Sequence, residues 1–317
     1  MQSPNQATKP AWPVAAADQV ATLSGHAGGV AALAFSPDRC LLAVACLGGP
    51  ARLWNLAGPN PRERGNLGPG DTRFTALAFS PNSRMVACGS GAADGLVWLF
   101  DASEKEPVSA GMMRGGRGAV GAVGFSPDNK LVAAAGDDRT LRVWEVPSPK
   151  GDPRTQLLGH GKPVRALAFT SDGQGLATAG LDDTVRLWAL GRIRSWERAN
   201  LPHAGEPTAL AYAPDGKSLA TGGKDGVIRL WDPTAIKPTP RTELRLPAGP
   251  VHLVLITADT FISVGDGPRV THWDVNARKP LREWEIPGGP ATAVALTPDG
   301  RYLAAGTAGG TVGVYRV

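Results

Sequence analysis

Histidine, threonine, aspartate and tryptophan recur in this chain at spacings that could bring them into contact. An imidazole beside a carboxylate can act as a general base, whereas the same groups buried together can form a hydrogen-bond chain that ends on an indole N–H. A catalytic pair has no reason to recur at one spacing in successive segments, so the repetition favours the structural chain. Three histidines each stand 28 residues before a tryptophan, in the pairs His26 and Trp54, His160 and Trp188, and His203 and Trp231.

Two segments supply every member of such a chain. In each, the histidine precedes a short apolar run, and the threonine lies in the next run. The aspartate occupies the turn before a third run that ends in the tryptophan. The two predicted tetrads are His160, Thr178, Asp182 and Trp188, and His203, Thr221, Asp225 and Trp231.

Other catalytic and metal-binding signatures are only near misses. Residues 215–218 (DGKS) end like a phosphate-binding loop, but the glycine expected five residues before Gly216 is missing. The acid pairs Asp137–Asp138 and Asp182–Asp183 suggest a metal, yet one member of each pair already belongs to the repeat. The three cysteines form no CxxC pair and fit small buried hydrophobes better. We therefore expect no enzyme, no cofactor and no metal site.

The composition describes a globular chain with a mild positive charge. Of its 317 residues, 42% are hydrophobic and 19% are charged, which is enough apolar material for a core. No apolar stretch approaches the roughly 18 residues of a membrane span, and the first residues lack the pattern of a signal peptide. We expect a cytoplasmic protein without membrane contact. The net charge of +5 bears on solubility more than on partners.

Seven segments end in an aromatic residue at spacings of 42 to 46 residues. A period in the low forties is typical of propeller blades of four strands each. Helical repeats of similar length fit poorly, because the segments are rich in Gly and Pro and alternate apolar residues with period two. Turns such as SPDR (36–39) and TPDG (297–300) separate the runs. The aromatic residues are Trp54, Phe100, Trp144, Trp188, Trp231, Trp273 and Tyr315.

These repeats resemble those of the WD-repeat (WD40) family, in the bacterial type that is rich in SPDG turns. The marks are Gly-His, the turn aspartate and Trp-Asp, as in DDTVRLW, DGVIRLWD and HWDV, and the resemblance covers residues 18–317. It implies an all-β fold, a single seven-bladed β-propeller of four-stranded antiparallel blades. The chain departs from the pattern where Gly48, Gly267 and Gly309 replace the turn aspartate. We expect those units to lack the full set of hydrogen bonds.

The two ends of the repeat region predict how the ring closes. The last unit stops at its third strand, TVGVYRV, while residues 18–26 begin with a spare strand. In the family that the chain resembles, such an N-terminal strand completes the last blade, which removes an open strand edge. Residues 1–17, with three prolines, are expected to form a flexible tail.

The resemblance also predicts a binding face. In such propellers, the loops before the first strand and between the second and third strands of each blade gather around the central channel, and we call this side the narrow face. The resemblance implies a non-enzymatic scaffold with a regulatory or signalling role, which binds a protein or peptide partner as a monomer. The alternative is a small-ligand or hydrolytic site at the channel mouth near His252 and Arg165. The predicted partner-binding residues are Leu47, Arg73, Thr75, Asp137, Arg165, Leu181, Glu206, Thr208, Lys224, His252 and Asp266.

The basic residues fit structural roles better than nucleic-acid binding. One group lies in outer-strand segments, where charge protects sheet edges from aggregation. The arginines of a second group each stand two residues before a repeat tryptophan, with side chains expected to run along the blade and heads outward. Nucleic acid would require a continuous basic stripe with exposed aromatics, so we expect no such partner. The two groups are Arg192, Arg194, Arg198, Lys237, Arg241, Arg278 and Lys279, and Arg52, Arg142, Arg186 and Arg229.

Overall fold

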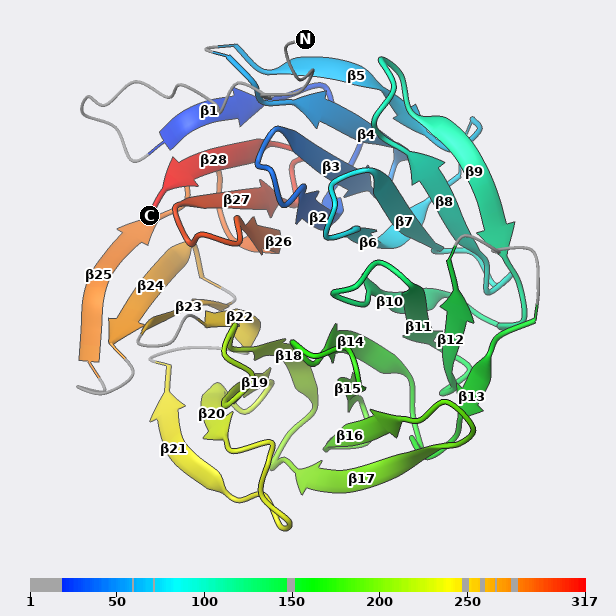
Figure 1. Ribbon diagram of the computed structural model, residues 1–317. Coiled ribbons are helices and arrows are strands. Elements are labelled where there is room, and N and C mark those ends of the chain that lie inside the picture. Colours follow the sequence, from blue (N-terminus) through cyan, green and yellow to red (C-terminus); the bar gives the residue numbers. More distant parts are fainter. Residues whose placement is uncertain are drawn as a thin grey trace, which may run out of the picture.

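Seven four-stranded antiparallel sheets stand around a common centre (Figure 1). The computed structural model describes residues 19–58, 60–70, 72–146, 152–246, 251–256, 260–265, 267–274 and 279–317, with backbone alone for 252–256. The prediction of a seven-bladed β-propeller is confirmed. The predicted tail, residues 1–17, lies outside the described residues. Among the described residues, all regular secondary structure is β-strand and none is helix.

The first three blades follow the chain in order, from the innermost strand to the outermost. Blade 1 consists of β2 (Val30–Phe35), β3 (Leu41–Cys46), β4 (Gly49–Asn55) and β5 (Arg62–Leu67). Blade 2 consists of β6 (Phe74–Phe79), β7 (Met85–Ser90), β8 (Val97–Asp101) and β9 (Val108–Met113). Blade 3 consists of β10 (Val120–Phe125), β11 (Leu131–Gly136), β12 (Leu141–Glu145) and β13 (Thr155–Leu157).

The next three blades repeat this order. Blade 4 consists of β14 (Val164–Phe169), β15 (Gly175–Gly180), β16 (Thr184–Leu190) and β17 (Ser195–Pro202). Blade 5 consists of β18 (Pro207–Tyr212), β19 (Leu219–Gly223), β20 (Val227–Trp231) and β21 (Pro240–Arg245). Blade 6 consists of β22 (Val251–Ile256), β23 (Thr260–Gly265), β24 (Arg269–Asp274) and β25 (Lys279–Glu285).

Blade 7 joins the two ends of the chain. It consists of β26 (Ala291–Leu296), β27 (Tyr302–Thr307) and β28 (Val312–Arg316), and its outermost strand is β1 (Gln19–Leu23). Strand β1 pairs antiparallel with β28, and Leu23 lies opposite Val312. The prediction that an N-terminal strand completes the last blade is therefore confirmed. The closed ring leaves no inner strand without neighbours on both sides (Figure 1).

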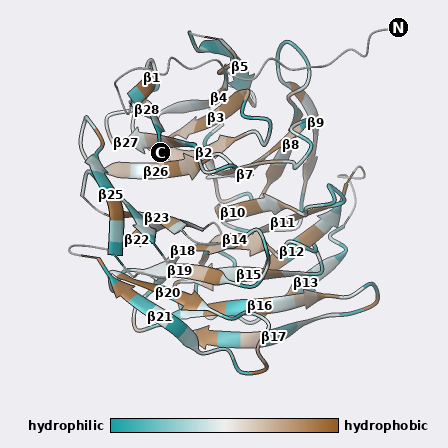
Figure 2. Ribbon diagram, turned by 60° about the vertical axis from the view of Figure 1, so that its left-hand side comes forward, coloured by the Kyte–Doolittle hydropathy of each residue, from teal (hydrophilic) through white to brown (hydrophobic). Residues whose placement is uncertain are grey.

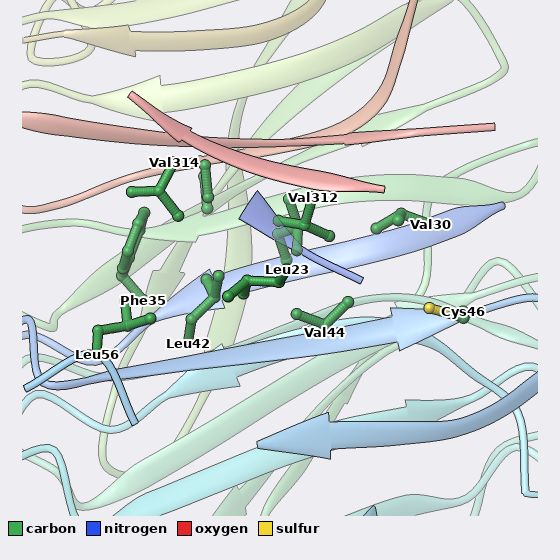
Figure 3. Close-up of a cluster of buried hydrophobic side chains, with 12 residues drawn as sticks. Leu23, Val30, Phe35, Leu42, Val44, Cys46, Leu56, Val312 and Val314 are labelled. Carbon is green, nitrogen blue, oxygen red and sulfur yellow. The ribbon is translucent and has the colours of Figure 1, made fainter. Parts of the chain in front are cut away.

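The core lies between neighbouring blades. Figure 3 shows the seam where blade 7 meets blade 1, with Leu23, Val312 and Val314 packed toward Val30 and Val44. The second strands supply the most buried surface, since every residue of β3, β11 and β15 is buried. Strands covered on both faces require continuous apolar and small residues, which explains runs such as LLAVAC and GLATAG. Burial of this kind stabilises the fold by about 25 cal/mol per Å² of apolar surface.

The turns between first and second strands form the side of the ring opposite the narrow face. In blade 1 the Ser36 hydroxyl donates to Asp38 over 2.5 Å, and Asp38 in turn accepts the Cys40 N–H. Such side-chain bonds fix the turn backbone, as the SPDG pattern predicts. Neighbouring turns are also joined, since the Asp38 N–H donates to Ser83 of the next blade over 3.0 Å. We call this side the turn face.

Candidate functional site

Backbone hydrogen bonds hold the two kinds of narrow-face loop together within a blade. The N–H that follows the second strand donates to the carbonyl that precedes the first strand. This bond recurs at nearly constant length, from 2.8 to 2.9 Å, in five blades. The loops are therefore fixed in position, and their side chains project from a rigid base. The bonds join Leu47 to Gly29, Gly91 to Arg73, Asp137 to Ala119, Leu181 to Pro163, and Lys224 to Glu206.

Among the described residues, two ion pairs join predicted partner-binding residues on this face. The Arg165 guanidinium, from the innermost strand of blade 4, is 3.0 Å from the Asp137 carboxylate of blade 3, and each side chain is 40% exposed. In blade 5 the Lys224 ammonium lies 2.5 Å from Glu206. The hydrogen bond from Lys224 lowers the pKa of Glu206 below its ordinary value. The structure thus brings four of the predicted residues together in pairs, and all four remain accessible to a partner.

Three other predicted residues lie in or next to these loops, and in the part of the chain that the structure describes none of them forms an ion pair. Leu47 is 55% exposed. Arg73 is exposed and Leu181 is half-buried. These residues add two apolar groups and one basic group to the face. The face therefore mixes both signs of charge with exposed apolar surface.

The two predicted threonines connect blades. The Thr75 hydroxyl donates to the Val120 carbonyl of blade 3 over 2.7 Å. Thr208 likewise donates to the Val251 carbonyl of blade 6. Thr292, at the same strand position, bonds to Val30 of blade 1, so the contact is part of the repeat. Their hydroxyl protons are thus engaged within the ring, and their assignment to the binding face stays a prediction.

Two predicted residues cannot be placed in the site. The side chain of His252 and the whole of Asp266 lie outside the described residues. The alternative site at the channel mouth depends on His252. Because the side chain of His252 lies outside the described residues, this alternative stays a prediction.

The blade 4 tetrad forms one continuous hydrogen-bond chain. His160 Nδ1 lies 3.0 Å from Asp182 Oδ1, and His160 Nε2 lies 2.7 Å from Thr178 Oγ1. The Trp188 indole donates to the same hydroxyl over 2.7 Å. A carboxylate only accepts and an indole only donates, so Nδ1 carries the imidazole proton and the Thr178 O–H donates to Nε2. Every polar group of the chain is thereby satisfied inside the blade.

Burial controls the ionisation of this chain. It lowers the pKa of His160 more than the bond to Asp182 raises it, so the imidazole is less basic than in water. Burial alone would raise the pKa of Asp182, but the Gly161 N–H, the Thr184 hydroxyl and His160 together bring it below its ordinary value. The tetrad therefore holds a neutral imidazole against a charged carboxylate.

The blade 5 tetrad differs from the predicted arrangement at its aspartate. His203 Nε2 lies 2.8 Å from Thr221 Oγ1, and the Trp231 indole donates to that hydroxyl over 2.8 Å. His203 Nδ1, however, bonds to the Leu201 carbonyl at 3.1 Å. Asp225 instead accepts a bond of 2.6 Å from the Arg229 guanidinium. A buried arginine binds a carboxylate more strongly than a neutral imidazole does, which explains the exchange of partners.

Blade 1 shows a shorter version, in which His26 and Trp54 meet as their spacing predicts but without a hydroxyl between them. The Trp54 indole lies 3.1 Å from His26 Nε2, and His26 Nδ1 lies 3.0 Å from the Gly310 carbonyl of blade 7. Val44 stands where blade 4 has Thr178, so the indole reaches the imidazole directly. The missing hydroxyl at Val44 was the available signal. The backbone acceptor left no sequence mark, since any residue supplies a carbonyl.

The arginines two residues before each tryptophan pair with carboxylates. Their heads were expected to point outward, but the side chains of Arg142, Arg186 and Arg229 are only 11%, 16% and 8% exposed. Buried guanidinium groups require acids, and the turn or the outer strand supplies them. The pairs are Arg52 with Glu63 at 3.0 Å, Arg142 with Asp138 at 2.6 Å, Arg186 with Glu197 at 2.5 Å, and Arg229 with Asp225 at 2.6 Å.

Three depressions between blades lie away from the narrow-face residues. One of about 630 Å³ lies between blades 3 and 4, one of about 370 Å³ between blades 4 and 5, and one of about 300 Å³ between blades 1 and 2. Their walls include turn-face residues such as Asp128, Asp172 and Asn82. Among the described residues no three metal-ligating side chains cluster, and this part of the chain has no helix able to cross a membrane.

Comparisons with known proteins find the same repeat. The family model described as "WD domain, G-beta repeat" (WD40) matches residues 17–55, 66–101, 109–145, 151–189, 198–232 and 278–316. The chain is 33% identical to actin-interacting protein 1-2 of Arabidopsis thaliana over 126 residues, which are 39% of this chain and 20% of that protein. It is 30% identical to small ribosomal subunit protein RACK1 of Caenorhabditis elegans over 127 residues, which are 38% of each.

A third relative, protein groucho of Drosophila melanogaster, is 28% identical over 110 residues, 35% of this chain and 14% of its own length. The chain thus spans well under two thirds of the curated relatives that it matches. The six matched segments together cover more than half of the sequence and fall on the inner strands of blades 1 to 5 and of blade 7. The chain belongs to the WD40-repeat family.

Proposed function

We propose that this propeller is a non-enzymatic scaffold with a regulatory or signalling role, which binds a protein or peptide through its narrow face. The observation that carries the proposal is the set of accessible charged side chains on loops that backbone bonds hold rigid. Arg165, Asp137, Lys224 and Glu206 present both signs of charge there. Ordered loops reduce the conformational entropy that binding would otherwise cost.

The surroundings of these pairs favour a macromolecular partner. Exposed Leu47 and Arg73 extend the same face beyond the ion pairs. A surface that mixes apolar groups with paired charges suits complementary side chains of a polypeptide. The histidines of the described tetrads are occupied by structural bonds, so they do not offer a general base. Two relatives are named an actin-interacting protein and a ribosomal subunit protein, and these names are consistent with a scaffold that binds other proteins.

Affinity capture from a lysate of cells that produce the protein tests this proposal. The narrow-face variant combines Arg73→Glu, Arg165→Glu and Lys224→Glu. The matched control reverses the same number of charges on exposed turn-face residues, with Arg84→Glu, Lys217→Glu and Arg301→Glu. We expect a discrete protein to bind the wild type and the control and to be lost from the narrow-face variant. A monomeric state and a cytoplasmic location remain predictions.

A further inference from the structure

The hairpin at the outer rim of blade 4 places an aromatic side chain among arginines. Arg192, Arg194, Trp196 and Arg198 occupy alternate positions that lead into and along β17. Arg192 lies in the bend that precedes the strand and lines the depression between blades 3 and 4, whereas Trp196 and Arg198 line the depression between blades 4 and 5. Trp196 is 50% exposed and neighbouring Ile193 is 102% exposed. Figure 2 shows hydrophobic and hydrophilic residues interspersed along β17.

Strand β17 also offers a long free edge. It contains eight residues, whereas the outer strand of blade 3 contains three. Within the described residues β17 pairs with β16 alone, as the outermost strand of its sheet. In an antiparallel edge strand every second residue directs its N–H and C=O away from the sheet. Those groups can pair with another extended chain.

Two depressions flank this hairpin. The one toward blade 5, of about 370 Å³, is lined by Trp196, Arg198 and Tyr212. The one toward blade 3, of about 630 Å³, is lined by Arg154 and Arg192. Both include Leu190 and Gly191, so the hairpin stands between them.

A second exposed apolar side chain lies close to the first depression. Arg198 donates to the Ala235 carbonyl over 3.3 Å, which holds the blade 5 turn against the rim of blade 4. Ile236, the next residue of that turn, is 95% exposed. Exposed isoleucines thus occur in the turns on both sides of the depression.

The charge at this rim is positive and unneutralised. Among the described residues no carboxylate pairs with Arg192 or Arg194, and both side chains are exposed. The acids nearby are already engaged. Glu197 pairs with Arg186 at 2.5 Å, and Asp172 accepts bonds from the Thr170 hydroxyl and the Gln174 N–H.

Edge protection does not explain the whole arrangement. Arginines alone would discourage another strand from pairing with β17. An exposed tryptophan and an exposed isoleucine beside them work in the opposite direction, because each contributes apolar surface that association would bury. Arginine and tryptophan are also the residues most enriched where partners bind strongly.

We propose that the outer edge of β17 binds an extended acidic peptide segment of a partner protein, independently of the narrow face. The peptide pairs with β17 as an additional strand of the blade 4 sheet, in either the antiparallel or the parallel direction. Its carboxylates pair with Arg192, Arg194 and Arg198, and one of its large apolar side chains packs on Trp196. A single-stranded nucleic acid would also meet arginines and an aromatic ring, but it cannot use the free N–H and C=O groups of the edge.

A fluorescein-labelled peptide of about nine residues tests the proposal, because that length matches one strand. Glutamates and one phenylalanine occupy alternate positions, with threonine between them. Its fluorescence anisotropy is titrated with the wild-type chain at low salt. We expect saturable binding to the wild type. The affinity should be about tenfold lower for the variant Arg192→Glu/Arg194→Glu, and it should also be lower for Trp196→Ala. The matched control, Lys105→Glu/Lys279→Glu, changes exposed lysines at the corresponding hairpins of blades 2 and 6 and should bind as the wild type does.

Two further arms separate the mode and the class of ligand. A peptide of the same sequence, N-methylated at alternate residues, loses the backbone donors on one edge and should bind about tenfold more weakly. The narrow-face variant should retain full affinity, which separates this site from the proposed function. Equal weakening by the lysine control, equal binding of the methylated peptide, or tighter binding of an oligothymidylate probe would each overturn the proposal.

Discussion

Arg165 on the innermost strand of blade 4 reaches to 3.0 Å from Asp137 of blade 3, so this ion pair spans two blades on the narrow face. Both side chains are 40% exposed. Exposed pairs of this kind contribute about 0–1 kcal/mol to stability, because solvent screens them. The pair is therefore available for recognition at little cost to the fold.

Neutralising Arg165 should leave stability almost unchanged. We expect Arg165→Gln to lower the free energy of unfolding in urea by less than about 1 kcal/mol. The comparison variant is Arg229→Gln, whose side chain is 8% exposed and pairs with Asp225 and Glu243. Removing it leaves a largely buried carboxylate unpaired and should cost about 3 kcal/mol. Equal losses from the two variants would contradict the distinction between a surface pair and a structural pair.

Asp182 is the acceptor on which the blade 4 chain depends. Asp182→Ala leaves the His160 Nδ1–H, the Gly161 N–H and the Thr184 hydroxyl without their common acceptor. We expect the free energy of unfolding to fall by about 2–4 kcal/mol. Asp183→Asn is the control, since Asn tolerates the positive φ of 62° at this position. A urea midpoint for Asp182→Ala that matches the control would show that the chain adds no stability.

Stability should decrease as the pH falls from 7 to about 5. Burial lowers the pKa of His26, His160 and His203 below the ordinary value of 6.5. The unfolded chain therefore binds protons near pH 6.5 that the folded chain does not, so protons favour unfolding in this window. The lowered pKa of Asp182 acts only at more acidic pH. Urea titrations at several pH values should show a shallower slope for His160→Asn than for the wild type. An identical slope would show that the native His160 pKa is not lowered.

Closure by β1 predicts different outcomes for two truncations. Deletion of residues 1–25 removes β1 and with it Leu23, which is 1% exposed in the seam between blades 7 and 1. The deletion exposes the edge of β28 and should prevent cooperative folding. Deletion of residues 1–16 removes no described residue and should leave the melting temperature unchanged. Circular dichroism melts measure both, and similar behaviour of the two truncations would contradict closure.

The repeat spacing predicts the propeller ring, but it does not predict which of several nearby groups becomes the hydrogen-bond partner of a side chain. The 28-residue interval placed His160 and Trp188 on one hydroxyl, because strand lengths and turns are uniform within the unit. The partner of Asp225 could not be predicted, since it depends on how deeply Arg229 is buried. The contacts of Thr75 across to blade 3 were equally hidden, because a period describes positions within a blade and not distances between blades.

The proposed peptide-binding edge of β17 was not predicted from the sequence, for a different reason. Its arginines were interpreted as protection of the edge, and the exposure of Trp196 among them depends on the packing of the neighbouring blade. The narrow-face assignment of Arg165 and Lys224 stays a prediction, although the structure shows both side chains accessible.

Calorimetric titration of the protein captured by wild type is the most direct measurement of the central claim. It uses purified wild type, the narrow-face variant Arg73→Glu/Arg165→Glu/Lys224→Glu and the turn-face control Arg84→Glu/Lys217→Glu/Arg301→Glu. A binding surface on the narrow face predicts an affinity at least about tenfold weaker for the first variant and unchanged affinity for the control. Unchanged affinity of the narrow-face variant, with loss in the turn-face control, would place the binding surface on the opposite side of the ring.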